Sequence, residues 1–193
     1  MPIPEDELRE VAKQGSKIVD WCLRDGDVAA VFESKATAFN KSALTTGKND
    51  EIESSLKQVF RGCEQCREFI LDCSKPSSPY HRVKGATKFF SVVVTRERMP
   101  LIDSVPMKEL MGPEHGETIV LSIQQLELLQ MFSSKGVSLF DSLSLIQENG
   151  LIGALKLLYE KTGAIHGASF LHRYDNALYE ALGEKVAGAI NKH

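Results

Sequence analysis

Apolar residues recur every three or four positions along much of the chain, and this spacing predicts a mainly α-helical protein. The pattern is most regular over residues 50–73, where it continues without a break for about three heptads. The apolar positions of this stretch are Ile52, Leu56, Val59, Cys63, Cys66, Ile70 and Cys73. Since residues three and four apart share one face of a helix, the stretch predicts a long amphipathic helix.

The same spacing predicts two helices upstream, over residues 5–23 and 27–47. Acidic residues follow Pro4, as is typical of a helix N-terminus, and Gly26 and Gly47 are suited to end the two helices. Short connections between three amphipathic helices favour antiparallel packing. We therefore expect residues 1–74 to form an N-terminal three-helix lobe.

A proline- and serine-containing segment, residues 75–88, interrupts the helical pattern and predicts a basic linker. It is followed by FFSVVVT at 89–95, which is rich in β-branched and aromatic residues and predicts a strand. The sequence TIVL at 118–121 is the expected partner. We expect these two segments to form a small antiparallel β-ribbon.

The helical period returns at Ser122, where Ser122 and Gln125 have the spacing of a capping box. Further helices are predicted over 138–148, 151–161 and about 167–190. Residues 89–193 should therefore hold the ribbon and a C-terminal lobe of about four helices. The predicted fold class is mainly α, with an N-terminal three-helix lobe, a small antiparallel ribbon and this C-terminal helical lobe.

Residues 121–165 resemble the generic winged-helix or helix-turn-helix pattern, in which a turn, here Asn149-Gly150, precedes a second helix. The resemblance implies that residues 151–161 would enter the major groove of DNA. That helix is dominated by leucine and isoleucine, whereas bases and phosphates require hydrogen-bonding and positive side chains. We therefore interpret it as a packing helix. Its candidate partner interface is Leu151, Ile152, Leu155 and Leu158.

The charge is unevenly distributed, although the whole chain carries only 23 basic and 26 acidic residues. Residues 57–98 hold nine Lys or Arg against four Asp or Glu, and aromatic residues are interleaved among them. Cations beside aromatic rings are typical of single-stranded nucleic-acid binding, whereas the simpler interpretation is a solvated loop. The candidate anion or nucleic-acid contacts are Lys75, Tyr80, Arg82, Lys84, Lys88, Arg96 and Arg98.

Three cysteines and a histidine, Cys63, Cys66, Cys73 and His81, have the composition of a closed zinc site. All three cysteines also fall on the apolar face of the predicted helix 50–73. Free cysteine behaves as a small buried hydrophobe, so this spacing is explained without a metal. We predict no metal site and no cofactor.

The sequence contains no nucleophile motif, no glycine-rich cofactor turn and no carboxylate pair in a defined frame, so we predict no catalytic residues. No apolar run is long enough to cross a membrane and residues 1–10 do not resemble a signal peptide, which favours a cytoplasmic protein. We expect a non-catalytic protein that assembles through apolar helix faces, with itself or with a protein partner. The alternative is a protein that binds single-stranded RNA through residues 75–98.

Overall fold

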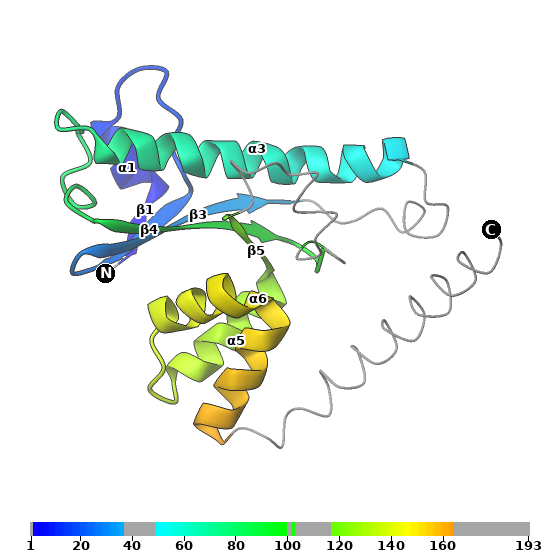
Figure 1. Ribbon diagram of the computed structural model, residues 1–193. Helices are drawn as coiled ribbons and strands as arrows, with labels where there is room; N and C mark the ends of the chain where they lie inside the picture. The colour runs from blue at the N-terminus through cyan, green and yellow to red at the C-terminus, as the bar shows by residue number, and fades with distance from the viewer. Residues whose placement is uncertain (1, 37–48, 100–101, 103–116, 164–193) are drawn as a thin grey trace.

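The computed structural model describes residues 2–36, 49–99, 102 and 117–163 of the chain. Their strands are β1 (Pro2–Pro4), β2 (Trp21–Asp25), β3 (Val28–Lys35), β4 (Lys88–Thr95) and β5 (Ile119–Ser122). Their helices are α1 (Glu5–Val11), α3 (Asn49–Ser74), α5 (Ile123–Ser133) and α6 (Leu139–Thr162). The five strands form one sheet in the order β1-β2-β3-β4-β5, with α3 on one face and α5 and α6 on the other (Figure 1).

The protein therefore has an α/β fold, and the prediction of a mainly α protein with a small ribbon is wrong. The error lies mainly in the helices predicted over 5–23 and 27–47. Only the start of the first is helical, as α1; an irregular segment follows at 12–20, and strands β2 and β3 come after it. A buried central strand is a nearly continuous apolar run, which periodicity alone does not distinguish from a buried helix. The two residues between these strands, Gly26-Asp27, are a pair typical of a tight β-hairpin turn.

The two strands predicted around residues 89–95 and 118–121 do pair, but their orientation is parallel rather than antiparallel. Strand β4 also pairs in parallel with β3, and β3 is connected to β4 through α3. Parallel neighbours require a long crossover connection, and a helix usually supplies it. One sheet thus continues across the predicted linker at 75–88, with β3 and β4 as adjacent strands.

The predictions for the later helices are closer to the structure. Helix α3 covers the predicted stretch 50–73 almost residue for residue, and the Ser122–Gln125 capping box is present at the start of α5. Helix α6 has a non-helical residue at Gly150, where the sequence predicts a turn. The predicted helix near 167–190 and the predicted helical residues 37–47 lie outside the described part of the chain.

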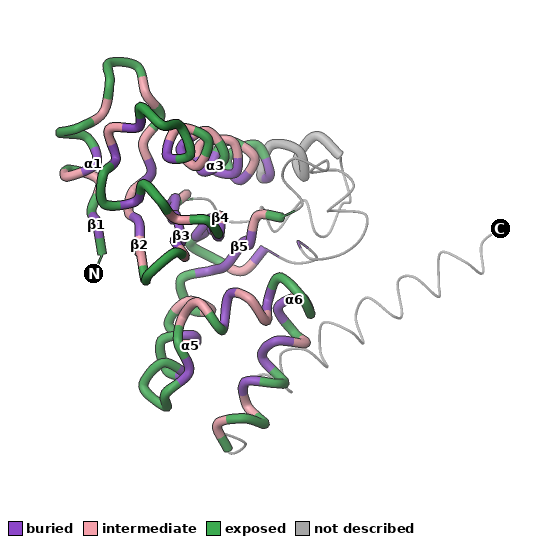
Figure 2. Tube along the Cα trace, turned by 60° about the vertical axis from the view of Figure 1, so that its left-hand side comes forward, coloured by how far each residue is buried: buried purple, intermediate pink, exposed green. Residues whose placement is uncertain are grey.

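The sheet separates two hydrophobic cores, because successive side chains on a strand point to opposite faces. On β3, Ala29 and Val31 pack toward α3, and Ala30 and Phe32 pack toward α5 and α6. Figure 2 shows the buried positions on the strands and on the sides of the helices that face them. Glu33 and Lys35 are the next alternate residues of β3 after Ala29 and Val31, so their side chains also point toward α3. No helix in the described ranges combines the length and the apolar character needed to cross a membrane.

Candidate metal centre

The basic residues that the sequence analysis selected lie at two ends of strand β4. Lys75, Arg82 and Lys84 precede this strand, and Arg96 and Arg98 follow it. At about 3.3 Å per residue, the eight residues of β4 separate the two groups by roughly 25 Å. The cations of residues 75–98 therefore form two groups, one before or at the start of β4 and one after its end.

Most of the cations before and at the start of β4 have partners within the chain, and Tyr80 is buried in the core below α3. The contacts are Lys75 Nζ to Asp72 Oδ1 at 2.5 Å, Arg82 to Glu7, Lys84 Nζ to Pro76 O at 2.5 Å, and Lys88 Nζ to Ser144 Oγ at 3.1 Å. Arg96 is exposed at the far end of the strand.

The candidate partner interface on α6 is largely internal. Leu151, Leu155 and Leu158 are buried in the core between α6 and the sheet, while Ile152 is 45% exposed. A helix that covers a sheet buries one apolar stripe in this way. Of the four candidate interface residues, Ile152 alone remains at the surface.

All four cysteines are buried in the core between α3 and the sheet, as the helical spacing of Cys63, Cys66 and Cys73 predicts, while Cys22 lies on strand β2. Burial raises the pKa of Cys22 to about 12, that of Cys63 to about 11 and that of Cys66 to about 12, and it raises the pKa of Cys73 as well. His81 is exposed. Within the described ranges, no three side chains of the His, Cys, Asp and Glu types are placed to hold one ion.

The buried thiols should resist alkylation in the folded protein. At pH 8, well below these thiol pKa values, the reactive thiolate is scarce, and the surrounding core excludes the reagent. We expect iodoacetamide to modify the native protein negligibly and all four cysteines after unfolding in urea, measured by intact mass. Rapid modification of any cysteine in the native protein would contradict its placement in the core.

A second group of polar side chains lies at the carboxyl end of strand β3, where the sequence analysis placed none. Glu33 and Lys35 are two residues apart on this strand and therefore point to the same face. Asp20 immediately precedes β2, and the pairing of Trp21 with Phe32 places Asp20 opposite Glu33. Asp20 Oδ2 accepts a hydrogen bond from the backbone N–H of Ser34 at 2.6 Å. The hairpin thus holds the two carboxylates side by side.

Glu33 is an almost fully buried acid, with its side chain only 4% exposed. Its Oε1 forms an ion pair with Lys35 Nζ at 2.6 Å, whereas its Oε2 is buried without a hydrogen-bond partner. Burial raises the pKa of Glu33 and the negative charge of Asp20 adds to the rise. The hydrogen bond from Lys35 and the nearby backbone N–H of Asp20 oppose it, although that N–H does not reach hydrogen-bond geometry with Oε2. An unsatisfied oxygen on a buried carboxylate costs stability, so a further ligand for Oε2 would be favourable.

Helix α3 fixes the position of Lys35. The Gln65 side chain accepts a hydrogen bond from Lys35 Nζ at 3.3 Å and donates one to the backbone carbonyl of Ile18. A Cβ atom at Gly62 would lie 3.2 Å from Lys35 Cε and 3.1 Å from a methyl group of Val93. The absence of a side chain at Gly62 therefore allows α3 to pack closely over the stem of Lys35.

This arrangement joins two carboxylates and one ammonium group at the edge where the parallel strands end. Lys35 is in register with Thr95 of β4, and Thr95 is in register with Ser122 of β5. Ligands of open α/β sheets bind outside this edge. Mg²⁺ is commonly held by one or two carboxylates, with water and substrate phosphates completing an octahedral shell. Asp20 and Glu33 are suited to be those two carboxylates.

The sequence did contain a signal for this group. Five apolar residues, Val28–Phe32, are followed directly by Glu33-Ser34-Lys35. An acid and a base two positions apart point to the same face if the segment is a strand. On a helix, Glu33 and Lys35 would point about 200° apart around the axis. The prediction of a helix therefore concealed that the two side chains lie close together. Gln65 carried no signal of its own, because its role depends on the packing of α3.

The fold and this group of side chains define a class: a mixed α/β domain with an acidic pair and a lysine at the carboxyl edge of its parallel strands. Comparison of the chain with protein-family models, with curated proteins and with solved structures gives no match. The chemistry of Asp20, Glu33, Lys35 and Gln65 is therefore the guide to function.

Proposed function

We propose that this protein is a divalent-cation-dependent hydrolase of phosphodiester bonds in nucleic acid. The observation that carries the proposal is the Asp20–Glu33 pair, with the buried and unpartnered Glu33 Oε2 beside Lys35. A buried ion pair contributes little net stability, because the loss of hydration offsets the attraction. A role in chemistry explains why the chain keeps these charges in a core of valine and cysteine.

Each residue has a distinct role in the proposed reaction. Asp20 and Glu33 would bind Mg²⁺ or Mn²⁺, which lowers the pKa of a bound water and polarises a phosphate oxygen. Lys35, held by Glu33 and Gln65, would stabilise the negative charge of the attacking hydroxide and of the phosphate. The water would lose a proton to solvent as its oxygen bonds to phosphorus, the bond to one ester oxygen would break, and that oxygen would take up a proton from solvent. The products are one phosphate end and one hydroxyl end.

The position of Arg96 supports a polyanionic substrate. Arg96 follows Thr95, which is in register with Lys35, and its side chain is exposed at the same edge of the sheet. Cations near a reactive centre bind the phosphates that flank the bond to be cleaved. Nucleic acid is thus retained as the ligand, and of the contacts predicted over residues 75–98 we propose Arg96, at the end of β4, as the one nearest the reaction.

A cleavage assay tests this function. We expect labelled DNA or RNA oligonucleotides to be cut in the presence of Mg²⁺ or Mn²⁺ and to remain intact with EDTA. Since deprotonated carboxylates are the ligands and the pKa of Glu33 is raised, the concentration of metal needed should fall as the pH rises from 5 to 8. Cleavage that persists in EDTA, or no cleavage of any single- or double-stranded substrate with either metal, would contradict the proposal.

Self-association is a second proposal, and the exposure of α6 supports it. Ile152 is 45% and Leu157 is 40% exposed on this helix. If a second copy of the chain covers them, sedimentation at micromolar concentration should give a dimer, and Ile152→Glu should shift the protein toward the monomer. A monomeric wild-type protein at all concentrations would exclude this assembly.

A further inference from the structure

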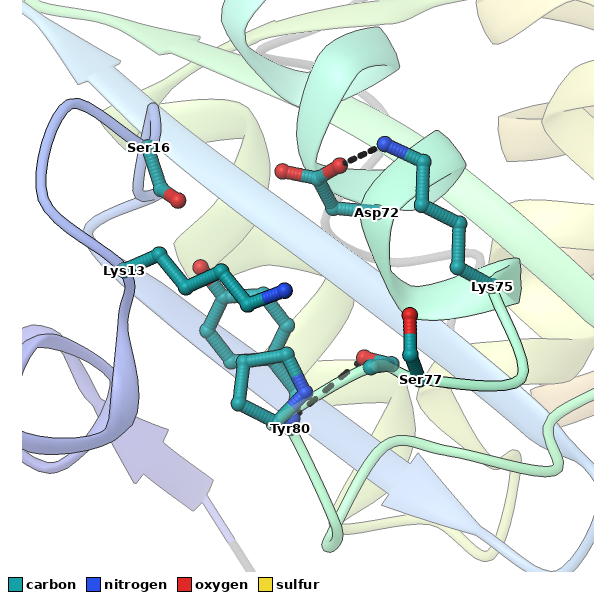
Figure 3. A pocket seen from close by; sticks show the side chains of 8 residues that line it. Lys13, Ser16, Asp72, Lys75, Ser77 and Tyr80 are labelled. Atoms are coloured by element: carbon teal, nitrogen blue, oxygen red, sulfur yellow. Dashed lines mark hydrogen bonds and ion pairs between the residues drawn. The ribbon is translucent and has the colours of Figure 1, made fainter.

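A small cavity lies at the C-terminal end of α3, about two helical turns beyond Gln65, the α3 residue that contacts Lys35. It is formed by the C-terminal end of α3, the turn that follows it and the loop after α1 (Figure 3). Asp72, which lines the cavity, is seven residues beyond Gln65, and at 1.5 Å per residue the two lie about 10 Å apart along the helix. The cavity is therefore separate from the candidate metal centre.

The cavity has the side chains of an anion site. Lys13 and Lys75 both line it, and Asp72 pairs with Lys75 at 2.5 Å, which leaves a net charge of +1. Lys13 forms no ion pair with any residue that the structure describes. Ser16 and Ser77 line the same cavity and each contributes a hydroxyl group (Figure 3). An ammonium group and several hydroxyls are suitable donors for a phosphate.

Tyr80 provides a second, independent observation. It lines the cavity and is 2% exposed, and its hydroxyl is buried without a hydrogen-bond partner. Burial raises the pKa of Tyr80, and nearby Ser16 opposes the rise without reaching hydrogen-bond geometry, so at neutral pH the phenol keeps its proton and can donate it. Buried polar groups are nearly always satisfied, so a ligand that accepts a hydrogen bond from this hydroxyl would be favourable.

The size of the cavity restricts the ligand. Its volume is about 120 Å³, which exceeds the space for a single water and is smaller than the roughly 300 Å³ at which drug-sized ligand sites begin. We infer that this cavity binds one phosphate group, either free inorganic phosphate or a terminal phosphate monoester. Lys13 supplies the charge, and Ser16, Ser77 and Tyr80 supply hydroxyl donors. This inference is independent of the proposed hydrolase activity.

Isothermal titration calorimetry with EDTA in the buffer tests the inference, because EDTA removes the divalent cations through which phosphate could bind at Asp20 and Glu33. We expect the wild-type protein to bind inorganic phosphate, and Lys13→Ala to weaken that binding about tenfold or more because a charged donor is lost. Lys135→Ala, which removes an exposed lysine beyond α5, is the matched control and should bind as the wild type does. Methyl phosphate distinguishes the two sources: binding comparable to that of phosphate indicates a monoester ligand, and its exclusion indicates free phosphate.

Tyr80→Phe separates a binding role from a structural one. The hydroxyl has no partner in the free protein, so its removal should leave the melting temperature unchanged or higher while phosphate affinity falls about fivefold. Absence of phosphate binding by the wild type at millimolar concentration would overturn the inference. Equal affinity of the wild type, Lys13→Ala and Tyr80→Phe would overturn it as well.

Discussion

Glu33→Gln and Asp20→Asn should each reduce metal-dependent cleavage by about a hundredfold or more. Each substitution keeps the shape of the side chain but replaces a negative oxygen ligand with a neutral amide, and Mg²⁺ binding depends on that charge. Glu33→Gln should have the larger effect, because Glu33 also holds Lys35 at 2.6 Å. Initial rates of oligonucleotide cleavage, measured over a range of Mg²⁺ concentrations, provide the comparison.

The control for these variants is an exposed carboxylate on another element. Glu127→Gln on α5 removes the same charge from the chain and should leave the rate unchanged. Glu33→Gln should fold at least as stably as the wild type, because a buried carboxylate with an unpartnered oxygen is replaced by a neutral group. A Glu33→Gln protein that is folded and cleaves at the wild-type rate would remove Glu33 from the reaction.

Lys35→Met should destabilise the fold by about 3 kcal/mol at pH 8, because it leaves Glu33 buried without its cation. The loss of stability in Lys35→Met should depend on pH. The pKa of Glu33 in the folded protein is raised above its ordinary value of 4.5, so above that pH the folded state binds more protons than the unfolded state. Stability from this group therefore falls as pH rises through the folded pKa. Removal of Lys35 should raise the pKa of Glu33 further, so stability should continue to fall up to a higher pH.

Urea unfolding of Lys35→Met at pH 5 and at pH 8 measures this effect, with the larger loss expected at pH 8. The double variant Glu33→Gln, Lys35→Met is the control, since it removes the buried charge together with its partner. It should recover most of the lost stability. A loss that is equal at both pH values, or a double variant as unstable as Lys35→Met, would show that Lys35 acts through packing rather than charge.

The parts of the fold that the sequence predicted are those specified by local patterns. Helix α3 follows from its three- and four-residue spacing, and the start of α5 follows from Ser122 and Gln125. Strand β3 was missed because a strand buried on both faces loses the alternation that marks a half-buried strand, and β2 was missed because Trp21, Cys22 and Leu23 are apolar on both of its faces. The parallel orientation of β4 and β5 is set by long-range packing, which no local pattern contains.

The candidate metal centre was missed for the same reason. Glu33 and Lys35 share a face only when residues 28–35 form a strand, so an error in secondary structure hid the chemistry. The cysteines were interpreted correctly as core residues, because a helix was the right structure for α3. The loop cations were selected by composition alone, and composition does not indicate that Arg82 would pair with Glu7 or that Lys75 would pair with Asp72.

The central claim is that Asp20 and Glu33 together bind a divalent cation, and diffraction from crystals grown with Mn²⁺ tests it most directly. We expect an anomalous peak at about 2.1 Å from one oxygen of Asp20 and from Glu33 Oε2, and its absence in Glu33→Gln crystals. Wild-type crystals that hold Mn²⁺ at other positions but show no peak between these two carboxylates would contradict the claim.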